Sequence, residues 1–528
     1  MRRRLAAGVV ALTAVLALSG AAAHAQDQDN TKAEMEKYKQ RMDEMEKKLD
    51  QLEAEKAQRA ATESEADRQK ERQRMEDLEK KIEDLQAVQK TYQEEKGLDV
   101  HGFRGYWKDH LYLETNDKNI VLGIGARFNL DAASINGNQN LNEALKGKQT
   151  DGTEVRRFRL HLYGTFYDDI FFKLQPDFSV QSSTEQKTTS VPAGFTSTPN
   201  QGATVALKDA YIADLHDIPY TTLRLGHFQE PFNLEEIDND QDYTFMERGL
   251  NDAFAPSYQI GIMAYHPILD QRMTWWAGFF RGTDNPENLQ DSGTVAGSNF
   301  GFSQFDGGYD AAARVTGCPI YADNGNEVLH LGASAVVRDP KTPVDFAARP
   351  EMHLASNFAN TGPLVNKAGS SNASQVELEN GEFRAIYGPY AVLSEVTAVQ
   401  VNRLGAGDCY FDGGYVTASY MLTGEHLGYD RTTGYDDRLI PFRNIGSYKD
   451  GKRGWGAWQL AARFSWIDLN SNSVRGGRLE DETLGLNWYL GPNIRLMFNY
   501  VLANLYDAPV KPHNGVCNMF GMRLGMDF

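Results

Sequence analysis

The chain ends in FGMRLGMDF, residues 520–528, in which apolar and polar residues alternate without interruption. A period of two places successive side chains on opposite faces of a β-strand. Chain termini are usually polar and frayed, so an aromatic last residue on an alternating strand indicates an end that is held in a sheet. The two faces are Phe520, Met522, Leu524, Met526 and Phe528 on the apolar side, and Gly521, Arg523, Gly525 and Asp527 on the polar side.

The same alternation recurs along the chain from residue 97 onward. Within residues 120–132, for example, Phe128 and Leu130 fall in the apolar phase and Arg127 falls in the polar phase. Strands of about ten residues with one lipid-compatible face are typical of transmembrane β-barrels, whereas strands of soluble sandwiches are nearer five or six residues long. About 430 residues, at roughly 25–30 for each strand and its connection, predict an all-β fold, a transmembrane antiparallel β-barrel of about 16 strands. In such a barrel the last strand pairs with the first, so that no strand edge is exposed to lipid.

The first 25 residues have the features of an export signal. Arg2, Arg3 and Arg4 precede a short apolar run that ends before Ala23-His24-Ala25. A basic start, an apolar core and a small-x-small end predict a signal peptide over residues 1–25, with an uncleaved anchor as the alternative. The chain is acidic, with a formal net charge of −18, and nucleic acid is therefore excluded as a partner.

Residues 26–96 differ in composition from the rest of the chain. They contain no Gly or Pro and are dense in Glu, Lys, Gln and Arg. Apolar residues recur at steps of three and four, beginning with Met35 and Tyr38 and again with Met75 and Leu78. This spacing predicts a helical coiled coil in the periplasm before a barrel domain at 97–528. A solvated single helix and a disordered charged linker are the alternatives.

Several blocks of sequence carry a family resemblance. They are EVRRFRLHLYG from Glu154, LRLGHFQEPFNLEEIDNDQDYTFMERGL from Leu223, MLTGEHLGYD from Met421 and GAWQLAARFSWIDL from Gly456. In this order they resemble the phosphate-selective porin O and P family, while the coiled-coil segment lies outside the resemblance. The resemblance implies a sixteen-stranded, homotrimeric porin in lipid of the bacterial outer membrane. Its best-known members pass phosphate and polyphosphate through a basic lumen.

The polar phase of the predicted strands contains a set of basic residues that we expect to face the lumen. A series of guanidinium groups lowers the barrier for anions, and the planar fork of Arg pairs two phosphate oxygens at once. The alternative is that these residues pair with inward acids and hold the barrel wall. The set is Arg127, Arg157, Arg159, Lys173, Arg224, Arg314, Arg463, Arg495 and Arg523.

Residues 230–248 form an acidic segment that opposes this basic set. If the segment folds into the lumen as a constricting loop, it places negative charge at the narrowest point. Its carboxylates have two interpretations. They determine the electrostatic potential that passing ions meet at the constriction, or they pair with arginines of the barrel wall. The predicted constriction acids are Glu235, Glu236, Asp238, Asp240, Asp242 and Glu247.

The sequence therefore predicts a diffusion channel for small anions, with phosphate implied by the resemblance. A general or weakly cation-preferring channel is one alternative. A structural tether, in which residues 27–96 contact peptidoglycan, is another. An enzyme is not expected, because the chain has no GxSxG or HExxH motif.

Neither a cofactor nor a metal site is predicted. The DNDQD segment starting at Asp238 lacks the glycine and the final glutamate of an EF-hand loop, which excludes an EF-hand and leaves a looser calcium site with neighbouring carboxylates as the alternative. Cys318, Cys409 and Cys517 have no CxxC spacing, and one disulfide among them stays open. The Trp275-Trp276 pair is expected to anchor the barrel at the membrane interface rather than to bind sugars.

Overall fold

The chain forms two compact units, residues 1–122 and residues 123–528. The described part of the first unit contains an antiparallel meander of β1 (Leu98–Val100), β2 (Phe103–Trp107) and β3 (Leu111–Thr115). The predicted signal peptide, and all of the predicted coiled coil except residues 47 and 48, lie outside the described residues. The computed structural model describes residues 47–48, 98–100, 102–108, 110–179, 205–216, 218–281, 308–341, 344–365, 372–449 and 452–528.

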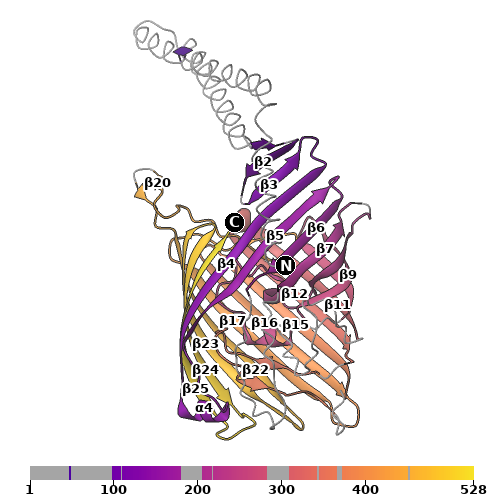
Figure 1. The fold of residues 1–528 in the computed structure, drawn as a ribbon, viewed down its shortest axis with the longest axis vertical. Helices are drawn as coiled ribbons and strands as arrows, with labels where there is room; N and C mark the ends of the chain where they lie inside the picture. The colour runs from indigo at the N-terminus through magenta and orange to yellow at the C-terminus, as the bar shows by residue number, and fades with distance from the viewer. Residues whose placement is uncertain are drawn as a thin grey trace, which may run out of the picture. The chain divides into compact units, whose positions relative to one another are not determined.

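The second unit is a closed antiparallel β-barrel of 16 strands (Figure 1), which confirms the predicted fold class. The barrel closes where β25 pairs with β4, with Asp527 opposite Arg127. Its strands are β4 (Ile120–Gly137), β5 (Gly152–Phe166), β6 (Ile170–Asp177), β7 (Ala206–Asp214), β8 (Thr222–Gln229), β9 (Tyr258–Ile268), β10 (Met273–Arg281), β11 (Tyr309–Ala322), β12 (Glu327–Asp339), β15 (Ala373–Tyr387), β16 (Tyr390–Arg403), β17 (Cys409–Met421), β22 (Ala457–Ser471), β23 (Val474–Gly491), β24 (Ile494–Tyr506) and β25 (Gly515–Asp527).

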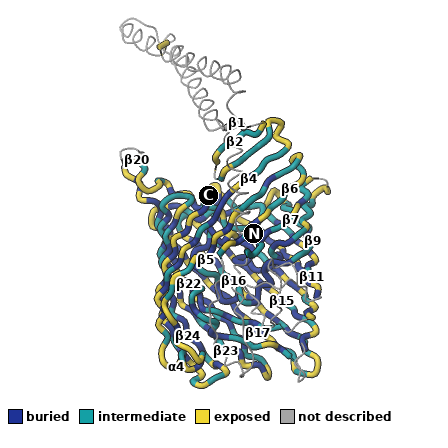
Figure 2. The backbone as a smooth tube through the Cα atoms, in the orientation of Figure 1, coloured by how far each residue is buried: buried dark blue, intermediate teal, exposed yellow. Residues whose placement is uncertain are grey.

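Buried and exposed residues alternate along the barrel strands (Figure 2), as a period of two requires. On β25, Gly521 and Arg523 are buried inside the barrel, while Phe520 and Met522 are exposed on its outer face. The last residue extends the pairing. The backbone N–H of Phe528 donates to the carbonyl of Ala126 at 3.0 Å, and the reverse bond is 2.7 Å long. An aromatic C-terminus therefore completes the ladder that closes the barrel.

Successive connections lie at alternate ends of an antiparallel barrel. Most connections at the end that holds the C-terminus are short, such as residues 167–169 and 388–389. The connection 422–456 is a long exception at this end. Long connections at the opposite end include residues 230–257 and 340–372.

These connections carry short elements of their own. None of the helices in the described ranges is long and apolar enough to cross a membrane. All three cysteines are free and buried. The short elements are α4 (Gln139–Ala144), α5 (Leu234–Ile237), η1 (Leu250–Phe254), η2 (Asp323–Gly325), β13 (Ala347–Ala348), β14 (Ala359–Asn360), β18 (Gly428–Tyr429), β19 (Asp436–Asp437), β20 (Tyr448–Lys449) and β21 (Lys452–Arg453).

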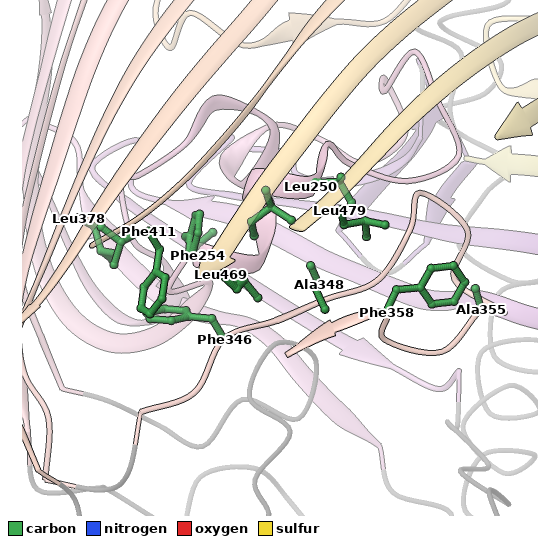
Figure 3. Close-up of a cluster of buried hydrophobic side chains, with 14 of the residues drawn as sticks. Leu250, Phe254, Phe346, Ala348, Ala355, Phe358, Leu378, Phe411, Leu469 and Leu479 are labelled. Carbon is green, nitrogen blue, oxygen red and sulfur yellow. The ribbon is translucent and has the colours of Figure 1, made fainter. Parts of the chain in front are cut away.

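A buried apolar cluster joins two of the long connections to the barrel wall (Figure 3). The ring of Phe254 in η1 lies 5.3 Å from that of Phe346, which belongs to the connection between β12 and β15. Phe346 in turn lies 5.7 Å from Phe411, an inward residue of β17. Apolar packing therefore holds both connections inside the barrel.

Candidate functional site

The connection between β8 and β9, residues 230–257, crosses the interior of the barrel, and we call it the lumen loop. Asn487 of β23 donates to the Thr244 carbonyl at 2.7 Å. The side chain of Asn251, further along the loop, donates to the Thr397 hydroxyl of β16 at 3.2 Å. Because these partners stand on strands separated by β17 and β22, the loop spans the space between them.

Asp240 is the carboxylate of the lumen loop with the densest cationic surroundings. Its Oδ2 lies 2.5 Å from Nε of Arg157 and 2.7 Å from Nη1 of Arg159. Arg127 of β4 also forms an ion pair with Asp240, and its Nη2 donates to Asn239 at 2.6 Å. Three guanidinium groups from two neighbouring strands therefore converge on one buried carboxylate.

Glu247 forms the second ion-pair centre of the loop. Arg156 of β5 donates to its two oxygens at 3.0 and 3.1 Å. Arg523 of β25 donates to Glu247 at 2.6 Å and to both oxygens of Asp131 at 2.7 Å. Burial raises the pKa of Glu247, but Arg156 and Arg523 outweigh burial and hold this pKa well below its usual range.

The first turn of the loop is held by Glu235 and the short helix α5. Arg463 of β22 pairs with Glu235 and lies 3.5 Å from Glu351, which the β12–β15 connection supplies. Glu395 on β16 accepts hydrogen bonds from the first two backbone N–H groups of α5. Glu236 pairs with Arg248 inside the loop itself. The carboxylates here are therefore matched by guanidinium groups or by backbone donors.

A third ion-pair centre joins the lumen loop to residues 422–456. Arg384 of β15 lies 2.9 Å from Asp436 and 3.5 Å from Asp238. The backbone N–H of Asp436 donates to Asp238 at 2.9 Å. Burial, and then the nearby Asp436, raise the pKa of Asp238 well above its usual range. Two segments that enter from opposite ends of the barrel therefore meet at one wall arginine.

Five of the predicted constriction acids thus have a cationic partner. Asp242 instead accepts a hydrogen bond from Asn239 at 2.7 Å. Burial raises the pKa of Asp242 to about 7, although Arg495 and Arg127 act against the shift. Arg495 itself donates to the Tyr243 carbonyl at 2.7 Å. The predicted basic residues that contact the lumen loop are Arg127, Arg157, Arg159, Arg463, Arg495 and Arg523.

These contacts match the interpretation in which the carboxylates of residues 230–248 pair with arginines of the barrel wall. A passing anion would have to compete with carboxylates that already occupy most of these arginines. Selectivity as a role for either set stays a prediction.

Sequence reasoning did not select several residues of the site. Alternation with Arg157 and Arg159 predicts that Arg156 faces outward, yet Arg156 contacts Glu247. The alternation of β5 changes phase between Arg156 and Arg157, so both side chains face inward. Arg384 and Glu395 lie on β15 and β16, two strands along which inward and outward positions alternate strictly. A period of two in the sequence could therefore have identified both residues as inward. Glu351 lies in a connection, where no periodic signal exists.

The sequence model of the family described as phosphate-selective porin O and P matches residues 123–528. The chain belongs to this family. It is an outer-membrane porin, and the matched residues coincide with the barrel unit.

Individual relatives are distant. An uncharacterized protein of Caulobacter vibrioides is 28% identical over 312 residues, a match that spans 56% of this chain and 57% of that protein. The trimer form of OmpT from Vibrio cholerae shares 7% identity over 78% of this chain and 99% of its own, with a TM-score of 0.44. An anion-selective porin from Comamonas acidovorans shares 12% identity over 77% of this chain and 100% of its own, with a TM-score of 0.41.

The porin's other predicted basic residues lie away from the lumen loop. Arg314 of β11 pairs with both oxygens of Glu382 at 2.9 and 3.1 Å. Its guanidinium lies 4.5 Å from the ring of Trp276. Trp276 is therefore buried inside the barrel, and its predicted place in the interface girdle is wrong. Lys173 of β6 lies 2.7 Å from Asp209 of β7.

Proposed function

We propose that this porin is a diffusion channel for small anions, with phosphate as the inferred solute. The observation that carries the proposal is the set of arginines that β4, β5, β22, β24 and β25 direct at the lumen loop. Guanidinium groups on a pore wall lower the barrier for anions and disfavour cations. The family's description supports phosphate.

The test is the reversal potential of the reconstituted porin in a planar bilayer across a potassium chloride gradient. We expect an anion-selective potential, and phosphate added to one side should reduce the chloride current. Variants Arg157→Gln and Arg159→Gln should weaken that reduction, because each removes a donor near Asp240. Arg478→Gln is the matched control, because this side chain lies on the outer face of β23, half exposed.

A general or weakly cation-preferring channel is the second candidate. The observation that favours it is the extent to which carboxylates of the lumen loop occupy the wall arginines, at Asp240 and Glu247 above all. A cation-selective potential that phosphate does not change would establish this candidate and reject the anion channel.

We also propose that residues 26–96 form a periplasmic coiled coil and that the porin is a homotrimer, with residues 27–96 contacting peptidoglycan. A trimeric coiled coil would match the symmetry of a trimeric barrel. Deleting residues 27–96 should detach or bleb the envelope while single-channel conductance stays unchanged. A normal envelope after the deletion would reject the tether, and cross-linking of the full chain would test the trimer.

A further inference from the structure

The inner wall of β5 to β8 carries a row of aromatic rings, which we call the aromatic track. Tyr163 lies 6.5 Å from Phe171, Phe171 lies 6.0 Å from Tyr211, and Tyr211 lies 5.7 Å from Phe228. The first three of these side chains are only half buried. The lumen wall of a porin is normally polar, so a row of aromatic rings of which three remain partly accessible requires an explanation.

Arg224 of β8 lies on this track and, like Arg495 but unlike the other predicted basic residues, forms no ion pair in the described ranges. Its guanidinium carbon is 4.3 Å from the ring centre of Tyr211 and 5.2 Å from that of Tyr265. Its Nη2 makes one long hydrogen bond, 3.5 Å, to the Tyr265 hydroxyl, and its Nε is buried without a partner. Within the described ranges, no carboxylate forms an ion pair with Arg224.

Among the charged residues around Arg224, the positive charge of Arg224 itself is not neutralised by an ion pair. Lys173 and Asp209 lie beside it and pair with each other. Tyr435, from the connection 422–456, is acted on by both Arg314 and Arg224. Burial raises the pKa of Tyr435 to about 12 despite these two arginines, so its hydroxyl stays protonated and can donate.

We infer that Arg224 and the aromatic track form a binding site for small monocarboxylates that carry an aromatic or apolar body. The rings cover the faces of the guanidinium, and a ligand therefore approaches its edge, where two parallel N–H donors fit a carboxylate. One unpaired positive charge matches a monoanion. The body of the ligand would lie along the rings, where offset or edge-to-face packing is favourable.

The inference rests on the proposed anion function and adds a solute class to it. Arg224 offers one unpaired positive charge, which matches a monoanion better than a phosphate dianion. The site lies near the barrel end that holds the short turns 167–169 and 269–272. The arginines that pair with Asp240 and Glu247 lie on β4, β5 and β25, so the aromatic track, on β5 to β8, shares only β5 with them. The aromatic track and the ion-pair centres are therefore distinct features of one lumen.

Calorimetric titration of the detergent-solubilised full chain with sodium benzoate and with sodium acetate tests the inference. We expect benzoate to bind about tenfold more tightly than acetate, because only benzoate has a ring to pack on the track. Arg224→Gln should weaken benzoate binding by about tenfold or more. The control Arg478→Gln should bind benzoate as the wild type does.

Tyr211→Leu is the second variant, and it keeps Arg224 in place. It should bring the affinities for benzoate and acetate close together. Equal affinities in the wild type, or benzoate binding that survives Arg224→Gln in a barrel that still migrates as folded, would overturn the inference. The reversal potential decides the proposed function separately, since calorimetry reports binding whichever ion the channel prefers.

Discussion

Replacing Asp240 by Asn tests the ion-pair centre of the lumen loop most directly. The change removes the negative charge but keeps the size of the side chain. Arg127, Arg157 and Arg159 would then face a neutral amide, and Arg159 would retain its ion pair with Asp177 at 2.7 Å. We expect the loop to lose its preferred position while the strand ladder of the barrel stays intact.

The magnitude follows from the burial of the groups. Asp240 is 4% exposed, and the three arginines are 6% exposed or less. Removing one partner of a buried ion pair costs about 3–5 kcal/mol, because it leaves uncompensated charge out of water. At 1.4 kcal/mol for each factor of ten, the equilibrium of the loop would shift by about a hundredfold or more. The lumen would also gain one net positive charge.

Single-channel recording and reversal potentials in planar bilayers measure both effects. Asp240→Asn should give a noisier current with additional conductance levels and a stronger preference for anions. Asp339→Asn is the matched control, because Asp339 pairs with Lys341 at a site where both side chains are about half exposed and such pairs contribute about 0–1 kcal/mol. A current and a potential for Asp240→Asn that equal those of Asp339→Asn would refute the reasoning.

Two further predictions concern the pH response and the barrel wall. The buried Asp242, with its pKa of about 7, is ionised above that pH and neutral below it, so wild-type reversal potentials should become more anion-selective between pH 8 and pH 6. Because the folded state then binds more protons than the unfolded state, the contribution of Asp242 to stability falls as the pH rises from about 4 to 7. Asp242→Asn should reduce this step, and an unchanged step would contradict the assignment. Gly226→Ala should lower the folded fraction on heat-modifiability gels, since a Cβ there would lie 2.3 Å from the Ala210 carbonyl at a φ of +141°, a strain of order 1–3 kcal/mol. Gly381→Ala, whose Cβ would have no atom within 4 Å, is the control that should fold normally.

The barrel could be predicted from the sequence because lipid and lumen impose a period of two on every strand. Where bulky outward residues contrast with polar inward ones, as at Phe520 and Arg523, the period identifies the strand and the face together. The contrast is weaker on β11 and β12, whose outward residues include Ala313 and Ala335. The period therefore marks the boundaries of these two strands less clearly.

The candidate site was predictable only in part. The inward position of Arg463 and Arg495 follows from alternation, and the structure confirms that position. Their partners do not follow from it, since Glu235 lies 228 residues from Arg463 in the chain and in a segment without periodicity. On β5 the alternation of inward and outward residues shifts by one position between Arg156 and Arg157. This shift depends on the local backbone geometry, and a pair of adjacent arginines in the sequence does not indicate it. Long-range pairing of this kind is a property of the closed barrel.

The lumen loop also bears on how the barrel is assembled. Its Asp240 pairs with Arg127 on the first strand of the barrel, and its Glu247 pairs with Arg523 on the last. Those two strands form the seam at which the sheet becomes a cylinder. The loop therefore braces the seam from within, and its two carboxylates reach their partners on both sides once the seam has closed. The position of the loop in the lumen and the closure of the cylinder therefore stabilise one another.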